Sequence, residues 1–302
     1  MAQPETAGWR GKFAGLALIL AILSVAWFAV AALGTKYGLW SWQFGLGTLT
    51  VGLGPAVAFG ALGLSVLALL IGVLKAPRKR PVMLAIGAIL ISGYVAGRLV
   101  GFGSVAQSLP PIHDVQTDWE DPISFSETLM AAREADGALN PVKPDPVIPE
   151  TADSRWPGLG GRRVAEVQQE AEYDPARDAE PEDAPYPRLD TITVPGTLGN
   201  VARLCEALMR EEGWEIVTAS NVTAGTLEAQ IEATATTGWF GFRDDVAVRL
   251  RAVDDGVEVD MRSISRVGLS DLGANSRRVA GFLRTLERQA ETAARREREQ
   301  VG

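Results

Sequence analysis

The sequence predicts an α+β protein in which three transmembrane helices precede a soluble two-layer domain. Three apolar runs, residues 13–33, 51–74 and 82–102, are each long enough to cross a hydrocarbon core of about 30 Å as a helix. After residue 188, short segments with alternating apolar side chains lie between two segments of helical periodicity. The residues between these parts are rich in proline and acid. We therefore expect a membrane domain at 1–103, an acidic segment with short helices at 104–187, and an α+β domain at 188–302.

Charge separates the membrane part from the rest of the chain. Residues 1–102 hold eight Lys or Arg residues and one acidic residue, Glu5, whereas the whole chain has a net charge of −8. The residues after 102 are therefore strongly acidic, and such a surface repels a phosphate backbone. This acidic surface argues against a nucleic acid partner. The apolar runs with basic residues beside them instead predict that the chain contacts the lipid bilayer.

Basic residues near the apolar runs predict the orientation of the chain in the membrane. The loop between the second and third runs carries four of them, Lys75, Arg78, Lys79 and Arg80, whereas the first loop offers only Lys36. Positively charged loops stay in the cytoplasm. We therefore expect a multi-pass protein of the bacterial inner (cytoplasmic) membrane with a cytoplasmic N-terminus and a periplasmic C-terminal domain.

Small residues form a stripe along the third apolar run. Gly93, Gly97 and Gly101 recur every four residues and would lie on one face of the helix. Packing among the three spans is the interpretation that we favour, and oligomerisation through the stripe is the alternative.

The secondary structure after the membrane part follows from the apolar periodicity. Short helices that pack on the later domain are expected at 124–135 and 163–172. Much of the remaining acidic segment, including YDPARDAEPEDAPYP at 173–187, should lack regular structure. Strands are expected at 189–194, 214–219, 226–235, 246–253 and 257–264, and helices at 198–212 and from 271. These elements predict a mainly antiparallel sheet with its two main helices on one face.

Alternation along the strands also assigns charged side chains to the face of the sheet opposite the helices. We expect that face to be open to solvent, with cross-strand ion pairs worth roughly 0.2–1 kcal/mol each. Its charged residues would be Glu228, Glu232, Arg249, Arg251, Glu258, Asp260 and Arg262.

The most concentrated polar chemistry lies in MRSISRVGLSDLGANSRR at 261–278, where a strand runs through a loop into a helix. If Ser270 caps that helix, the free amides of its first turn would point toward Ser263, Ser265 and Arg266 and could bind an anion. Alternatively, the motif is a structural latch in which Arg262 and Arg266 pair with carboxylates already present. The carboxylates available to them are Asp114, Asp118, Asp244 and Asp245.

Four segments also occur in one order that resembles the domain-of-unknown-function family 1499. They are IHDVQTDWEDPISF at 112–125, Tyr186-Pro187, FRDDVAVRLRA at 242–252, and RSISRVGLSDLGANSRRVAGFL at 262–283. The resemblance covers residues 109–288 and excludes the three spans. The polar positions that it implies are His113, Asp114, Thr117, Asp118, Asp244, Asp245, Arg262, Ser263, Ser265, Arg266, Ser270, Asp271 and Asn275. It implies no activity.

Three functions are compatible with these residues. A hydrolase would gather His113, Asp114, Asp245 and Ser265 in one cleft, but no nucleophile elbow or other diagnostic spacing is present. A purely structural envelope domain is the second alternative. A metal site is not expected, because the chain has one His and one Cys in no metal-binding spacing, and no cofactor motif occurs.

We favour a membrane-anchored extracytoplasmic binding or assembly module that uses the 262–275 loop together with residues 113–118. The ligand would be a lipid headgroup, a cell-wall fragment or an envelope protein. Three aromatic residues between two strands, Trp239, Phe240 and Phe242, would mark a contact surface if they are exposed.

Overall fold

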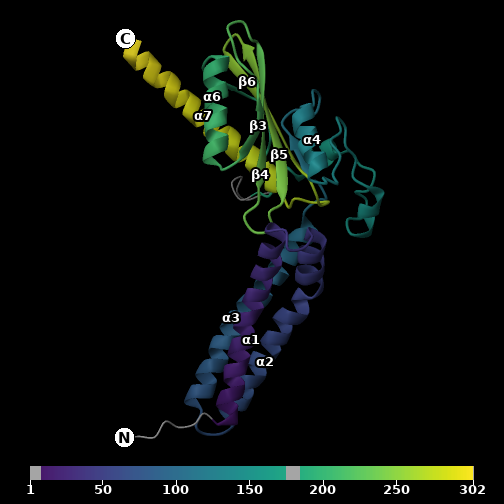
Figure 1. The fold of residues 1–302 in the computed structure, drawn as a ribbon, viewed down its shortest axis with the longest axis vertical. Helices are drawn as coiled ribbons and strands as arrows, with labels where there is room; N and C mark the ends of the chain where they lie inside the picture. The colour runs from purple at the N-terminus through teal and green to yellow at the C-terminus, as the bar shows by residue number, and fades with distance from the viewer. Residues whose placement is uncertain (1–7, 175–183, 302) are drawn as a thin grey trace. The chain divides into compact units, whose positions relative to one another are not determined.

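The computed structural model describes residues 8–174 and 184–301, which form two compact units (Figure 1). One unit comprises Met1–Ala106 with Thr237–Gly241, and the other comprises Gln107–Thr236 with Phe242–Gly302. Residues 175–183, in the acidic stretch expected to lack regular structure, lie outside the described residues.

The first unit contains the three predicted membrane helices. They are α1 (Trp9–Lys36), α2 (Gly54–Leu74) and α3 (Lys79–Ser108), and each is long and apolar enough to span a membrane. A π-helix, η1 (Gln43–Gly52), precedes α2, so the second candidate span runs from Gln43 to Leu74. The helical segment therefore begins earlier than the apolar run at 51–74 predicted.

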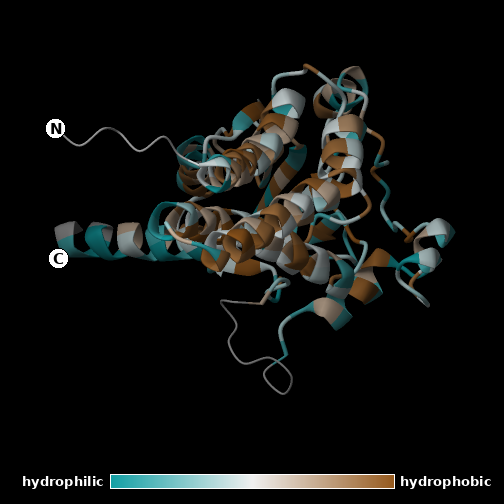
Figure 2. Cartoon of the chain, turned by 90° about the horizontal axis from the view of Figure 1, so that it is seen from below, coloured by the Kyte–Doolittle hydropathy of each residue, from teal (hydrophilic) through white to brown (hydrophobic). Residues whose placement is uncertain are grey.

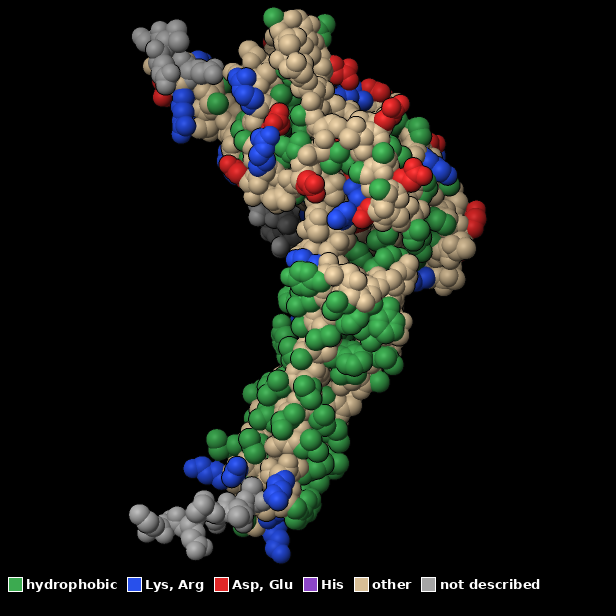
Figure 3. All heavy atoms as spheres, viewed as in Figure 1, with side chains coloured by type: hydrophobic (Ala, Val, Ile, Leu, Met, Phe, Trp, Pro, Cys, Tyr) green, Lys and Arg blue, Asp and Glu red, His purple; other side chains and the backbone are tan. Residues whose placement is uncertain are grey.

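Small residues line the inside of this unit. Ala17 of α1, Ala68 of α2 and Ala85 of α3 belong to one buried cluster, while large side chains such as Leu70 and Leu90 are exposed. Figure 3 shows hydrophobic side chains covering these helices, with Lys and Arg at the end that bears the N-terminus. Small residues allow the helices to approach closely, and the large residues outside suit a lipid environment.

The glycine stripe on α3 does not serve this internal packing as we expected. A Cβ atom at Gly97 or Gly101 would meet no atom within 4 Å, and one at Gly93 would meet only Leu62, at 4.0 Å. The interpretation of the stripe as packing among the three spans is therefore wrong for Gly97 and Gly101. The period-four pattern identifies a face of the helix but not what lies against it.

The second unit is built on an antiparallel sheet of order β1-β6-β5-β4-β3, with β2 pairing β6 as well. The strands are β1 (Asp114–Gln116), β2 (Ile192–Val194), β3 (Glu215–Ala219), β4 (Glu228–Thr236), β5 (Arg243–Val253) and β6 (Gly256–Ser265). The strands predicted after residue 188 are all present, although β2 is shorter than expected. β1 was not predicted, since three residues are too few to show a period.

Two main helices, α6 (Leu198–Glu211) and α7 (Ala274–Val301), cover one face of this sheet, as predicted. The core lies between them and the strands, where Val248, Leu250 and Met261 are fully buried. Trp214 stacks on Phe282 of α7 with ring centroids 5.4 Å apart. The α+β class is confirmed.

The opposite face of the sheet is covered, so the prediction that it is open to solvent is wrong. The segment that follows α3 carries α4 (Glu127–Ala135), the short 3₁₀ helix η2 (Glu150–Ser154) and α5 (Val164–Ala171). Figure 1 shows α4 across the sheet from α6 and α7. Four of the charged side chains assigned to this face are buried, namely Glu232, Arg249, Asp260 and Arg262. Alternation assigns a side chain to a face, but it does not tell whether a distant segment covers that face.

Candidate functional site

Strand β6 divides the polar residues of the motif between the two faces of the sheet. Ser263 and Ser265 point to the side of α7, where the Asn275 side chain contacts both. Arg262 points to the other side, and so does Arg266, which follows the strand end. The motif is therefore two neighbouring clusters on opposite faces of one sheet.

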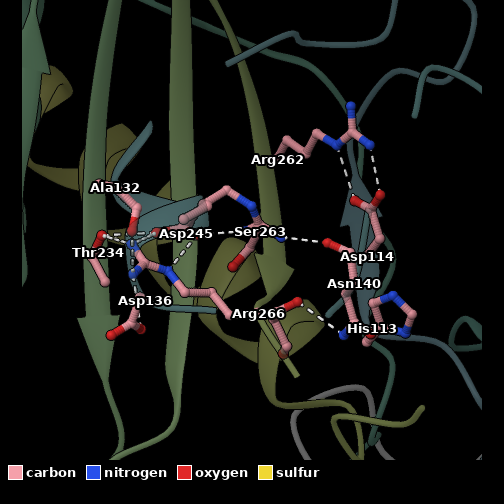
Figure 4. Close-up of polar contacts among 12 residues, drawn as sticks. His113, Asp114, Ala132, Asp136, Asn140, Thr234, Asp245, Arg262, Ser263 and Arg266 are labelled. Atoms are coloured by element: carbon pink, nitrogen blue, oxygen red, sulfur yellow. Dashed lines mark hydrogen bonds and ion pairs between the residues drawn. The ribbon is translucent and has the colours of Figure 1, made fainter. Parts of the chain in front are cut away.

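Arg262 forms a buried fork-to-fork ion pair with Asp114 of β1. Its Nε and Nη2 atoms donate to the two Asp114 carboxylate oxygens at 2.9 and 2.6 Å (Figure 4). The guanidinium also donates to the backbone oxygens of Ile123 and Lys143, each at 2.7 Å. The Arg262 side chain is 1% exposed. A bidentate pair with further hydrogen bonds can offset the cost of burying both charges.

A second cluster surrounds Asp245 of β5. Arg266 donates from Nε and Nη2 to the Asp245 oxygens at 2.9 and 2.7 Å (Figure 4). Arg133 of α4 pairs with the same carboxylate. Arg266 also pairs with Asp136 at 3.0 Å, and Thr234 donates to Asp245 at 2.8 Å. The cluster thus holds two arginines and two aspartates, and the Asp245 side chain is 0% exposed.

Burial and pairing act in opposite directions on these guanidinium groups. Burial lowers the pKa of Arg133 despite the nearby Asp245 carboxylate. Burial also disfavours charge on Arg266, but its bonds to Asp245 and Asp136 outweigh that effect and raise its pKa. Both groups stay charged, since arginine titrates far above neutral pH.

Hydrogen bonds also fasten the residues after α4 to the loop after β6. The backbone amides of Leu139 and Asn140 both donate to the Arg266 carbonyl, at 2.8 and 3.0 Å. The Asn140 side chain donates to the carbonyls of Ser265 and Gly268. Together with Arg133, these bonds attach α4 and the residues that follow it to the end of β6.

On the other face, Asn275 links the strand end to α7. Its side-chain nitrogen donates to Ser265 Oγ at 2.9 Å and to the His113 carbonyl at 3.0 Å, while its oxygen accepts from Ser263 Oγ at 2.7 Å. Arg278 then pairs with Asp244 at 2.6 Å.

Asp271, rather than Ser270, supplies the cap at the start of α7. Its two carboxylate oxygens accept from the amides of Gly273 and Asn275, each at 2.8 Å. Ser270 Oγ instead donates to the Pro110 carbonyl at 3.0 Å and accepts from the amide of Leu272. The expectations that Ser270 caps this helix and that these amides are free for an anion are therefore wrong. A carboxylate two residues before Gly273 competes better for these amides than a hydroxyl does.

The remaining predicted residues are not gathered into one cleft. His113 has its Nδ1 atom 3.3 Å from the Leu269 carbonyl, and burial lowers its pKa. Thr117 donates to Asp260, and Asp118 closes a turn by accepting from the amides of Glu120 and Asp121. Among the described residues, no hydrogen bond joins the His113 ring to Ser265, and no group of three or more His, Cys, Asp or Glu side chains is arranged to hold a metal ion.

Sequence reasoning missed two members of the Asp245 cluster, Arg133 and Asp136, and also Asn140, which bonds to the loop after β6. One signal was present, because Arg133 lies four residues after Leu129 on the buried stripe of α4. A charged residue on an apolar stripe needs a buried partner of opposite charge. Nothing in the sequence shows that this partner is Asp245, which lies 112 residues away.

Residues 114–286 match the model of a family described as a protein of unknown function (DUF1499), which covers more than half of the chain. The chain belongs to this family. The DUF1499 domain begins at Asp114, so it includes both arginine clusters and leaves out the three membrane helices. No curated protein and no solved structure matches the chain significantly.

Proposed function

We propose that this protein is a membrane-anchored extracytoplasmic module that binds or assembles with other components of the cell envelope. Within it, the 262–278 motif acts as a latch that holds the segment after α3 onto the sheet. The proposed partners are the bilayer together with a lipid headgroup, a cell-wall fragment or an envelope protein. Contact with a second copy through Gly93, Gly97 and Gly101 is a further part of the proposal.

The proposal of a latch rests on one observation, namely the ion pairs around the 262–278 motif. Four arginines pair with four aspartates, and Arg277, the remaining arginine of the motif, donates to the backbone carbonyls of Pro185 and Leu272. The members are Arg133, Arg262, Arg266 and Arg278 with Asp114, Asp136, Asp244 and Asp245. Buried arginines that already satisfy carboxylates favour an architectural role over ligand capture.

An exposed aromatic side chain supports a contact surface outside the latch. Trp239, in the connection between β4 and β5, is 65% exposed, whereas Phe240 and Phe242 are partly buried. A large exposed aromatic residue is a frequent anchor in interfaces with membranes or proteins.

Substitutions of the two aspartates in the Asp245 cluster test the proposed latch. In D245N, two buried guanidinium groups lose their shared carboxylate, which should destabilise the domain by about 3–5 kcal/mol. D136N is the matched control, since Asp136 pairs with Arg266 at a position whose side chain is 36% exposed and should cost about 1 kcal/mol or less. Urea unfolding of the full-length protein in detergent measures both free energies.

The same three proteins test assembly. Hydrogen exchange should be faster over residues 113–145 in D245N than in D136N or wild type. After extraction with native lipids, light scattering should give wild type and D136N a mass larger than one chain with its micelle, and D245N should lose the extra mass. A single-chain mass for wild type would contradict the assembly proposal, and equal exchange in all three proteins would contradict the latch.

A further inference from the structure

A cavity of about 690 Å³ lies in the second unit between the start of α6 and the C-terminal third of α7. α6 contributes Asn200, Val201 and Leu204 to its wall, and α7 contributes residues 288–290, 292–294 and 296. Beyond the cavity, the C-terminal end of α7 is hydrophilic (Figure 2). This place is separate from the latch, which lies at the opposite end of α7.

The cavity is lined by positive charge, although its domain is strongly acidic. Three arginines line it, Arg203, Arg288 and Arg296, and no Asp or Glu does. None of the three forms an ion pair with any residue that the structure describes, and Arg203 bonds only to the amide oxygen of Asn200. In a strongly acidic domain, three exposed arginines without an ion pair around one cavity indicate an anionic ligand.

The floor of the cavity is apolar. Val201 is 2% exposed and Ala290 is 3% exposed, and Leu204 is partly buried beside them. A bare inorganic ion would leave this surface wet, whereas an anion with an attached apolar group would cover it. Arginine is suited to phosphate, because its planar fork donates two parallel hydrogen bonds to one phosphate group.

We propose that this cavity binds a phosphate group that carries an apolar substituent, either the headgroup end of an anionic phospholipid or a soluble alkyl phosphate. The arginines hold the phosphate, and Val201, Leu204 and Ala290 receive the apolar part. The cavity and the latch lie at opposite ends of α7, so the proposal of a phosphate site and the proposal of a latch can each be wrong without affecting the other.

The test uses full-length protein in phosphatidylcholine nanodiscs, with butyl phosphate titrated in a calorimeter. The variant R288Q/R296Q removes two charges from the cavity. Its matched control, R284Q/R295Q, removes two exposed arginines of the same helix that do not line the cavity. Wild type and control should bind alike, and R288Q/R296Q should bind roughly tenfold or more weakly, because each lost charge-assisted hydrogen bond removes that order of affinity.

A second set of nanodiscs that contain phosphatidic acid distinguishes the two sources. Protection of residues 197–204 from hydrogen exchange in these nanodiscs, lost in R288Q/R296Q but kept in the control, identifies the lipid as the ligand. Binding of butyl phosphate without this protection identifies a soluble phosphate. The proposal is overturned if neither probe binds, or if both double variants lose affinity equally, which would indicate attraction to net charge alone.

Discussion

Asp271 caps α7 from a partly buried position, and two effects on its carboxyl group compete. Burial disfavours the ionised form, while the amides of Gly273 and Asn275 favour it. Burial prevails, and the pKa of Asp271 rises from 3.8 to about 6. The domain therefore holds an ionised cap at neutral pH at some cost in stability.

This shift predicts how stability depends on pH. Because the folded state binds the Asp271 proton more tightly than the unfolded chain, the stabilisation is present below pH 3.8 and is lost as the pH rises through about 6. Across this window D271N should gain stability relative to wild type, by no more than about 3 kcal/mol in the free energy of unfolding. The thermal midpoint of D271N should rise relative to that of wild type accordingly. Tryptophan fluorescence of the full-length protein during heating measures it.

D255N is the control, since Asp255 lies exposed in the turn between β5 and β6. Its midpoint should run parallel to that of wild type between pH 4 and pH 6. A D271N curve that also runs parallel to wild type would contradict the role of Asp271.

At the same scale, the sequence predicted more about the identity of the charged residues than about their pairing. Arg262 and Arg266 pair with Asp114 and Asp245, which were both among the four carboxylates considered. The competing anion site could not be weighed from the sequence, because it depends on whether Ser270 or Asp271 reaches the first amides of α7. Ser270 and Asp271 are neighbours in the sequence, and residue spacing does not show which of the two side chains accepts these hydrogen bonds.

The helices and strands themselves follow from the periodicity of their apolar residues. The structure contains α6, α7 and the strands from β3 to β6 close to their predicted places, because long amphipathic segments carry a strong local signal. Apolar spacing predicted that the helix at 124–135 packs on the later domain, but not that it covers the second face of the sheet. Coverage of that face depends on contacts between residues more than one hundred positions apart, such as that between Ser126 and Glu232.

The spanning helices give a prediction at the scale of an element. Added methyl groups in G97A/G101A would meet no atom of the same chain within 4 Å, so packing inside the unit should not change. They should instead weaken the proposed contact with a second copy and lower the mass of the solubilised protein. In G54A, the new Cβ would lie 2.7 Å from the Phe28 ring, so the midpoint should fall. Thermal unfolding in detergent, followed by circular dichroism, compares the two.

A mass equal to that of wild type for G97A/G101A would contradict the proposed contact through the stripe. A smaller mass would show that the stripe contacts another molecule in the detergent-solubilised protein. Light scattering on the same samples distinguishes that case from loss of internal packing.

At the scale of the whole molecule, sidedness in the membrane follows from charge near the spans. Lys75, Arg78, Lys79 and Arg80 predict a cytoplasmic loop between α2 and α3, and an odd number of spans then puts the DUF1499 domain outside. The single cysteine aids the test, because Cys205 is 0% exposed and burial raises its pKa well above the usual range. It should not react with a maleimide while the protein is folded.

Labelling of introduced cysteines checks this prediction. In cells with a permeabilised outer envelope, a membrane-impermeant maleimide should label D255C in the β5–β6 turn. It should label A76C, in the basic loop, only after the inner membrane is lysed. The reverse pattern would place the domain in the cytoplasm, and wild type, which has only Cys205, gives the background.

The pairing of β6 has a consequence for where this chain can accept inserted residues. β1 and β2 lie end to end along one edge of β6, where Gln116 is opposite Arg262 and Ile192 is opposite Val259. The stretch at 117–191 therefore leaves the sheet beside Arg262 and rejoins it beside Val259, three residues away on the same strand. Each doubling of such an excursion costs only about 0.6 kcal/mol of closure entropy. Exposed turns of this excursion, such as that at Gly137, are therefore natural places for inserted residues, whereas α4 must keep Arg133 against Asp245.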